Sequence, residues 1–353
     1  MLHKNRVFER LKTWHDQGQG MVLATVTDTD GSTYSKTGDF ILIAANGDYQ
    51  GLVSGGCVEG DLATRAAQTL ASRTPAIVDY DLGGEHDALW GMGAGCDGRL
   101  QILLTPLFEA EQYAPLLAVA DAYRNGISAV LGLGAPGTPQ AGLMTSASAE
   151  GHFVHHDVAA EAQATVERVL GEQWLAGCSA QVVDDALEAP LFVIHVRPAP
   201  RVLLCGAAPD AEPLARLLGD LGWHVTVYDH RPGYIETFDA KLAAERIAAP
   251  AAALAQRVAL AHFPVVVVMS HHLETDTAYL RALARHDHWH YIGLLGPVHR
   301  RERLLEAVGQ PADTIRPMID GPAGLPLGAK EPAGIALSIA AGIHARLAER
   351  GAL

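Results

Sequence analysis

Two cysteines in the first half of the chain lie in glycine-rich segments that could support thiol chemistry. Cys57 directly follows Gly55 and Gly56, and Cys96 lies in the glycine cluster 91–98. Cys57 also precedes a helix-like stretch, and the N–H groups and dipole at a helix N-terminus favour the thiolate, the nucleophilic and metal-binding form. Glycine leaves room for a ligand beside the backbone. We therefore expect Cys57 and Cys96 to face one site; for either alone, a small buried thiol is the common alternative.

A phosphate-type loop opens the second half of the chain. The strand-like run Arg201–Cys205 leads into Gly206-Ala207-Ala208, and a helix-like segment follows. This order is that of a dinucleotide-binding fingerprint, in which the first glycine permits the tight turn. Ala208 stands where a glycine would let a diphosphate approach most closely, and Asp229 ends the next strand, where a carboxylate suits a ribose hydroxyl. The alternative is a Rossmann-shaped domain that binds no ligand.

Two further polar segments follow strand-like runs, at the positions where open α/β sheets bind ligands. Ser270, His271 and His272 come directly after the valine-rich run 265–269. Arg300 and Arg301 stand near the start of a predicted helix that follows the strand-like run 291–294, and this placement favours an anion. For His271, the alternative is a loop histidine whose hydrogen bonds are satisfied by its neighbours.

The rest of the sequence predicts the elements that must position these residues. In the first half, helix-like and strand-like segments occur at 7–15, 21–27, 40–43, 49–54, 76–82 and 100–104, with a helix that ends near residue 72. In the second half they alternate regularly at 201–205, 211–221, 224–228, 251–261, 265–269, 276–285, 291–294 and 331–346. The predicted fold class is α/β, with a C-terminal Rossmann-like, doubly wound parallel sheet and an N-terminal α/β (mixed-sheet) domain. The proline-containing segment 197–200 predicts a boundary between domains 1–197 and 198–353.

Composition and charge narrow the classes of function. The chain has 353 residues and a formal net charge of −14, which argues against nucleic-acid binding because that affinity comes from clustered Lys and Arg. No segment reaches the roughly 18 apolar residues of a membrane span, and charges near the N-terminus argue against a signal peptide. The four cysteines form no C-x-x-C pair, so we expect a cytoplasmic protein without a disulfide framework. We interpret Cys178 and Cys205 as packing residues.

These segments resemble the xanthine dehydrogenase accessory factor family (XdhC/CoxI). The first half is similar through Gly31–Gly38 (GSTYSKTG), Ser54–Glu59 (SGGCVE) and Gly93–Arg99 (GAGCDGR). The second half is similar at Cys205–Ala211, Val227–Arg231, Met269–His272, Gly293–Gly296 and Gly328–Pro332. Two residues depart from the family pattern, namely Ala208 in place of the middle glycine and Val298 in place of a basic residue. The resemblance covers about residues 10–105 and 200–345.

The resemblance implies a maturation factor more than a turnover enzyme. Family members are implied to bind the molybdenum cofactor (molybdopterin), protect it or aid its sulfuration, and deliver it to a xanthine dehydrogenase-type molybdenum hydroxylase. A cysteine desulfurase is a further implied partner, and a homodimer is plausible for this family. Neither a membrane nor a nucleic acid is among the expected partners.

The same resemblance implies roles for individual residues, with the site in the crevice between the two domains. Cys57 and Cys96 are the working pair, which would ligate molybdenum, protect it or carry a persulfide. Lys36 and Arg99 would offset the negative charge of the ligand. The other implied cofactor-binding residues are Gly55 and Gly56 beside Cys57, Gly206, Ala207, Ala208 and Asp229 at the phosphate-bearing end, and Arg231 and His271 lining the cleft.

Two rival functions remain open from the sequence. An NAD(P)-dependent oxidoreductase acting on a small substrate explains the Rossmann half and Asp229, but it assigns no role to Cys57 and Cys96. A docking chaperone with a vestigial Rossmann half is the second rival, in which the acidic surface contacts the client.

Overall fold

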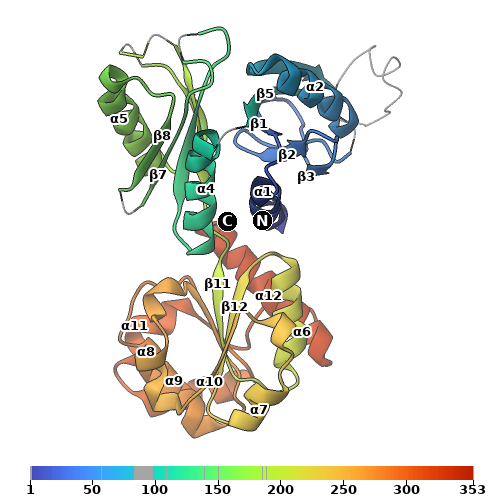
Figure 1. Ribbon diagram of the computed structural model, residues 1–353. Helices are drawn as coiled ribbons and strands as arrows, with labels where there is room; N and C mark the ends of the chain where they lie inside the picture. Colours follow the sequence, from blue (N-terminus) through green and yellow to red (C-terminus); the bar gives the residue numbers. More distant parts are fainter. Residues whose placement is uncertain are drawn as a thin grey trace. The chain divides into compact units, whose positions relative to one another are not determined.

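The computed structural model describes residues 2–56, 58–82, 98–108, 110–138, 140–149, 151–184, 186–187 and 189–352. The chain forms two compact units (Figure 1), of which the first is His3–Pro198 and the second begins at Ala199. Both units combine helices with sheets, which confirms the predicted α/β class. Among the described helices, none is both long and apolar enough to cross a membrane.

The second unit contains a parallel sheet with Rossmann topology. Its strands lie in the order β13-β12-β11-β14-β15-β16, and every pairing is parallel. When the six strands are numbered along the chain, their order in the sheet is thus 3-2-1-4-5-6, the arrangement of dinucleotide-binding folds. The strands are β11 (Arg201–Cys205), β12 (His224–Asp229), β13 (Glu245–Ala248), β14 (Val265–Val268), β15 (Tyr291–Leu294) and β16 (Ile319–Asp320).

Helices cover both faces of this sheet (Figure 1). Val202 and Leu204 of β11 pack towards α6 (Ala211–Asp220) and α12 (Pro332–Glu349), whereas Leu203 and Cys205 pack towards the opposite helices. The opposite face carries α8 (Leu254–Arg257), α9 (Leu273–Leu283), α10 (Val298–Val308) and α11 (Ala312–Ile315). A parallel strand buried on both faces must be apolar throughout, which explains the continuous apolar run of β11. Cys205 is fully buried, as a packing residue should be, whereas Cys178 is exposed.

The predicted helix 251–261 is wrong. Two 3-10 turns, Ala251–Ala253 and Leu260–His262, flank the single helical turn α8, and Val258 between them is extended. Alanine favours a helix, but Leu254, Val258, Leu260 and Phe263 are all buried in one core. In one continuous helix, Leu254 and Val258 would lie on one side, whereas Leu260 and Phe263 would lie on another, so the four could not all enter the same core. The edge strands β13 and β16 were also not predicted, because neither is long or periodically apolar.

The first unit contains two antiparallel sheets. The first sheet has the order β3-β2-β1-β5-β4, and α2 (Glu59–Ser72) packs against its core. The second has the order β8-β7-β6-β10-β9 and is covered by α4 (Ala110–Arg124) and α5 (Ala160–Ala176). All described pairings in this unit are antiparallel, so its sheets are more uniform than the expected mixed sheet.

The remaining elements of the first unit are the N-terminal helix and the strands of the two sheets. The N-terminal helix is α1 (Leu2–Asp16). The first sheet consists of β1 (Met21–Asp30), β2 (Phe40–Ala44), β3 (Tyr49–Gln50), β4 (Ala76–Asp81) and β5 (Arg99–Leu107). The second sheet consists of β6 (Ala129–Gly134), β7 (Met144–Ser148), β8 (Phe153–His156), β9 (Ala180–Val182) and β10 (Leu191–Val196). Gly47 turns between β2 and β3 with a φ of 87°, which is why the hairpin needs glycine there.

Candidate functional site

Three segments of the first unit that are far apart in sequence meet around the loop 31–38. Gly98 lies so close to this loop that a Cβ atom there would be 2.6 Å from the carbonyl oxygen of Ser32 and 2.8 Å from that of Asp30. On another side, a Cβ atom at Gly55 would be 3.6 Å from the ring of Tyr34. The glycines therefore permit close packing of backbone segments, and they bring parts of all three N-terminal motifs into one cluster, which we call the three-loop cluster (residues 31–38, 54–56 and 98).

A buried carboxylate holds the second of these loops at the start of α2. Glu59 is 1% exposed, and its Oε1 accepts hydrogen bonds from the amides of Val53 (2.8 Å) and Ser54 (2.9 Å). Its Oε2 accepts from the Ser54 hydroxyl (2.5 Å) and the Gly56 amide (3.0 Å). Burial opposes ionisation, but these hydrogen bonds outweigh it and hold the pKa of Glu59 below its ordinary value. No role was expected for Glu59 from the sequence; the available signal was an acid at the first residue of a helix, three residues after the pair Gly55-Gly56.

The predicted N-terminal site residues are only partly described. Cys57 and Cys96 lie outside the described residues, so their predicted roles remain predictions. Gly55 and Gly56 have φ angles of 75° and 111°, conformations that favour glycine. Lys36 and Arg99 are exposed, and the Lys36 Nζ lies 3.4 Å from the Thr33 hydroxyl in the three-loop cluster. Among the described residues there is no group of three potential metal ligands.

In the second unit, the turn after β11 is positioned by its neighbours in the sheet. Gly206 has a φ of 145°, and a Cβ atom there would be 2.5 Å from the Met269 carbonyl oxygen and 2.9 Å from the Ser270 amide nitrogen. Ala207 and Ala208 are buried, with 3% and 7% of their surfaces exposed. Close packing against the end of β14 therefore already requires the glycine, whether or not a phosphate binds.

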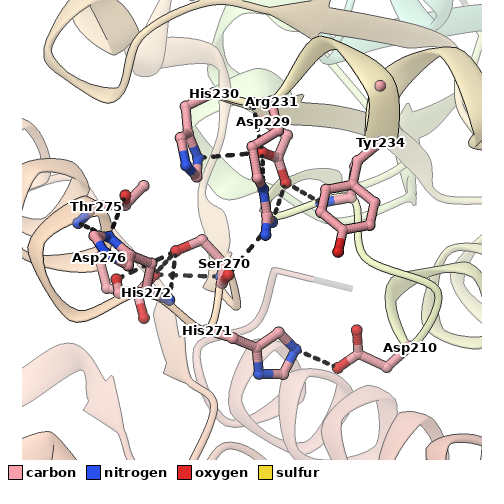
Figure 2. A network of polar contacts seen from close by, with 12 residues as sticks. Asp210, Asp229, His230, Arg231, Tyr234, Ser270, His271, His272, Thr275 and Asp276 are labelled. Carbon is pink, nitrogen blue, oxygen red and sulfur yellow. Dashed lines mark hydrogen bonds and ion pairs between the residues drawn. The ribbon is translucent and has the colours of Figure 1, made fainter.

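Asp229, at the end of β12, is fully buried and fully hydrogen-bonded (Figure 2). Its Oδ1 accepts from the Arg231 amide and Nε, both at 2.9 Å, and its Oδ2 accepts from the Ala207 amide and Arg231 Nη2, both at 2.8 Å. Burial opposes ionisation, but these donors prevail and lower the pKa of Asp229. A carboxylate has about four acceptor positions, and here protein donors use all four. A ligand hydroxyl would have to displace one of them.

Arg231 connects this carboxylate to the end of the neighbouring strand. Its Nη2 also donates to the Ser270 carbonyl oxygen at 3.3 Å, and its guanidinium carbon lies 4.1 Å from the centre of the Tyr234 ring. Arg231 therefore joins β12 to the turn after β14 while remaining about one-third exposed. Four predicted site residues, Gly206, Ala207, Asp229 and Arg231, are thus brought together here.

His271 lies apart from that ion pair and faces the N-terminus of α6. Its backbone has a φ of 63°, an uncommon conformation for a residue other than glycine. Its Nε2 lies 2.8 Å from Asp210 Oδ2 (Figure 2), and this hydrogen bond raises the pKa of His271 above its ordinary value. Non-glycine residues in this conformation concentrate at functional sites, where surrounding contacts hold them.

A second buried carboxylate supports the same turn. Asp276 of α9 is 1% exposed; its Oδ1 accepts from the Ser270 hydroxyl (2.5 Å) and amide (3.2 Å), and its Oδ2 accepts from Arg300 Nη2 (2.6 Å). The sequence analysis treated Asp276 only as the start of a helix and did not separate Arg300 from Arg301. Arg301 instead donates to Glu302 and to the Gly321 carbonyl.

A cavity of about 440 Å³ lies beside these groups in the second unit. Its charged lining residues are Asp210, His271, Arg300 and Lys330. Its apolar lining comes from α6, α12 and the ends of β14 and β15, and includes Leu214, Met269, Leu295, Ile335, Ala336 and Ile339. An apolar cavity with a few converging charged groups is typical of a small-molecule site.

Known proteins match both units. The model of the XdhC and CoxI family matches residues 14–81, and that of the XdhC Rossmann domain matches residues 202–343. A protein of Bacillus subtilis (strain 168) that is named as a probable xanthine dehydrogenase subunit is 32% identical over 327 residues, which cover 91% of this chain and 92% of that protein.

Two further similarities extend this comparison. The molybdenum cofactor insertion chaperone PaoD of Escherichia coli (strain K12) is 32% identical over 104 residues, 30% of this chain and 31% of that protein. The crystal structure of a xanthine dehydrogenase from Bacillus halodurans superposes with a TM-score of 0.80 at 28% identity and covers 97% of this chain and 96% of that one.

Proposed function

The chain belongs to the XdhC and CoxI family, and from that premise we propose that it is an accessory factor for the molybdenum cofactor. It binds molybdopterin as cargo, protects it or aids its sulfuration, and delivers it to a xanthine dehydrogenase-type molybdenum hydroxylase. The 104-residue similarity to a molybdenum cofactor insertion chaperone supports the cargo, and the name of the Bacillus subtilis relative supports the client.

The observation that carries this proposal is the three-loop cluster. Gly55 and Gly98 let the loop 31–38 contact the two later motif segments, and Glu59 holds the loop next to Cys57. In the proposal, the thiols of Cys57 and Cys96 handle the sulfur-ligated metal, because soft thiolates suit such a centre. They do so as ligands, as protecting groups or as persulfide carriers that a cysteine desulfurase loads.

The charged residues near these segments suit an anionic cargo. Lys36 and Arg99 are exposed and would offset the negative charge of the cofactor. In the second unit, Gly206, Ala207 and Ala208 would hold the phosphate-bearing end, with Asp229 keeping the turn in shape and Arg231 and His271 at its edge. We further propose that the protein acts as a cytoplasmic homodimer.

Cysteine variants test the proposal in the full-length protein. Wild type, Cys57→Ser and Cys96→Ser are purified from molybdate-supplied cells, and molybdenum and pterin are measured per monomer together with client activity. Both variants should lose maturation of the client while melting at the wild-type temperature. Cys178→Ser is the matched control, because Cys178 is an exposed free thiol away from the motifs. Wild-type client activity in both variants would overturn the assignment.

One observation favours a second candidate, an NAD(P)-dependent oxidoreductase. The strand order of the second unit is that of dinucleotide-binding folds. Titration with NAD(P)H and fluorescence of the oxidised pterin released from the purified protein separate the candidates. Saturable NAD(P)H binding without pterin supports the oxidoreductase, and released pterin supports the accessory factor. If neither NAD(P)H binding nor released pterin is found, the docking chaperone is supported.

A further inference from the structure

The cavity beside His271 in the second unit has a second lobe. This lobe is about 410 Å³ and shares Leu295, Gly296, Pro297 and Ile335 with the lobe of about 440 Å³ described above. The first lobe carries all the charged lining residues. The second is lined by the segment 322–329 and Ser338, and among the described residues it has no charged lining side chain. One end of the cavity therefore suits an anion, and the other suits an uncharged, partly apolar body.

Arg300 is held in place at the charged end. Its Nη2 donates to Asp276 Oδ2 at 2.6 Å, and Asp276 is fixed in turn by Ser270. The arginine side chain also lies across Gly296, where a Cβ atom would be 2.6 Å from Arg300 Cδ. A guanidinium has five N–H donors in a rigid fork, so the contact with Asp276 orients the group while donors remain for a ligand.

Two further cationic groups complete this end. The imidazole of His271 is held by Asp210, and this contact compensates the negative charge of the Asp210 carboxylate. Lys330 is exposed and forms no ion pair with another residue that the structure describes. Asp210 caps α6, Pro297 caps α10, and Pro332 begins α12, so three helix N-termini also border the cavity and add positive potential.

We propose that this two-lobed cavity binds a phosphate monoester carried on a flat, partly apolar body. Arg300, Lys330 and His271 contact the phosphate, and the body lies along the segment 322–329. Asp229 is itself an anion whose acceptor positions are filled by protein donors, so it offers a phosphate neither charge nor donors. None of Gly206, Ala207 and Ala208 lines the cavity, so the phosphate is placed at the end lined by Arg300, Lys330 and His271 instead of at that turn. The identity of the body as a pterin rests on the proposed function; the anion site does not.

Titration calorimetry on the full-length protein tests the site with two pairs of probes. One pair is the oxidised pterin phosphate of molybdopterin and the same pterin after phosphatase treatment. The other is adenosine 5′-monophosphate and adenosine. At least one phosphorylated probe should bind, and its dephosphorylated partner should bind at least about 10-fold more weakly, because charge-assisted hydrogen bonds are lost.

Variants locate the binding. Arg300→Gln should raise the Kd of the phosphorylated probe about 10-fold or more, and Lys330→Gln about 3- to 5-fold, as expected for an exposed charge. Arg303→Gln is the matched control, since Arg303 is exposed on the same helix α10 outside the cavity lining. Arg300→Gln leaves Asp276 unpaired and could unfold the protein for that reason. Lys330→Gln removes no described ion pair, so it tests the site even in that case.

The outcomes distinguish this inference from the proposed function. If no phosphorylated probe binds, if the dephosphorylated forms bind equally, or if Lys330→Gln and Arg300→Gln bind as wild type, the phosphate site is wrong even where pterin loading and client activation succeed. If adenosine 5′-monophosphate binds through Arg300 and Lys330 but purified protein never carries pterin, the site stands and the cargo assignment fails.

Discussion

The two units each bury a carboxylate at a loop of functional interest, but they stabilise its charge with different donors. Glu59 in the first unit accepts from three backbone amides and one hydroxyl, with no cation among these donors. Asp229 in the second unit accepts from a guanidinium at two atoms as well as from two amides. Amide donors shape the loop that carries them, whereas a guanidinium ties together two separate strands and keeps a cation near the surface.

This difference determines how each loop is held in shape. The first unit uses its own carboxylate to order backbone N–H groups, so its loop beside Cys57 is held in shape before any ligand arrives. The second unit pairs three of its basic side chains, Arg231, Arg300 and His271, each with a carboxylate, and those pairs orient the basic groups. A loop held by amides depends on one side chain, while a paired cation depends on two.

The largest effect is expected where a cation would be left without its partner. Asp229→Ala should lower the free energy of unfolding of the second unit by about 3 kcal/mol, because it removes four hydrogen bonds and leaves Arg231 and the Ala207 amide unpaired. Hydrogen–deuterium exchange of the β11 and β12 peptides measures this change. Asp220→Ala, at an exposed aspartate of α6, should stay within about 0.5 kcal/mol of wild type. Equal values for the two variants would contradict the importance of the ion pair.

A smaller loss is expected for the carboxylate that only amides and a hydroxyl hold. Glu59→Gln keeps one acceptor oxygen but loses the charge, and it should cost about 2 kcal/mol of local stability. The loss should appear as faster exchange in peptides spanning residues 52–72. Glu9→Gln on the exposed side of α1 serves as the reference and should leave those peptides unchanged. Exchange in the Glu59 variant as slow as in wild type would show that this loop does not depend on the carboxylate.

The pH dependence of the same variant gives the sign of the electrostatic contribution. The pKa of Glu59 is lowered on folding, so its negative charge stabilises the protein at pH values above 4.5, the pKa of the unfolded state. This stabilisation is lost as the pH falls through the pKa of the folded state. The difference in stability between wild type and Glu59→Gln should therefore be full at pH 7 and should shrink below about pH 4.5 in urea titrations. A difference that grows on acidification would mean that Glu59 is buried as the neutral acid.

The smallest effect concerns the close packing of the three-loop cluster. Gly98→Ala should destabilise the first unit by roughly 1–2 kcal/mol, because its Cβ atom would meet the backbone oxygens of Ser32 and Asp30. Gly60→Ala on α2 has open space around it and should be neutral or stabilising by up to about 1 kcal/mol. Thermal melting of the two proteins provides the comparison. If the Gly98→Ala protein had the same melting temperature as the Gly60→Ala protein, a role for close backbone packing at residue 98 would be ruled out.

Much of the architecture could be predicted because it depends on local patterns. The apolar runs Arg201–Cys205 and Val265–Val268, with the helices that follow, predict a parallel sheet, since such strands are buried on both faces. Where the local pattern and the packing disagreed, packing prevailed: the alanine-rich segment 251–261 has helix propensity, yet its buried residues required short turns around an extended Val258.

By itself, the sequence determined the fold class, most of the alternating strands and helices of the second unit and the family motifs, because strand and helix periodicity and glycine requirements act over a few residues. Only the tertiary structure decided which partner each charged group has. Asp229 is bound by Arg231 and by a turn 22 residues away, and Gly98 meets Ser32 just beyond the ends of the paired strands β5 and β1. Such pairings depend on how strands distant in sequence approach one another, and no local pattern encodes that distance. For this reason the sequence placed an anion near Arg300 and Arg301, whereas only the tertiary structure separated these two arginines and brought Arg300 and Lys330 to one cavity.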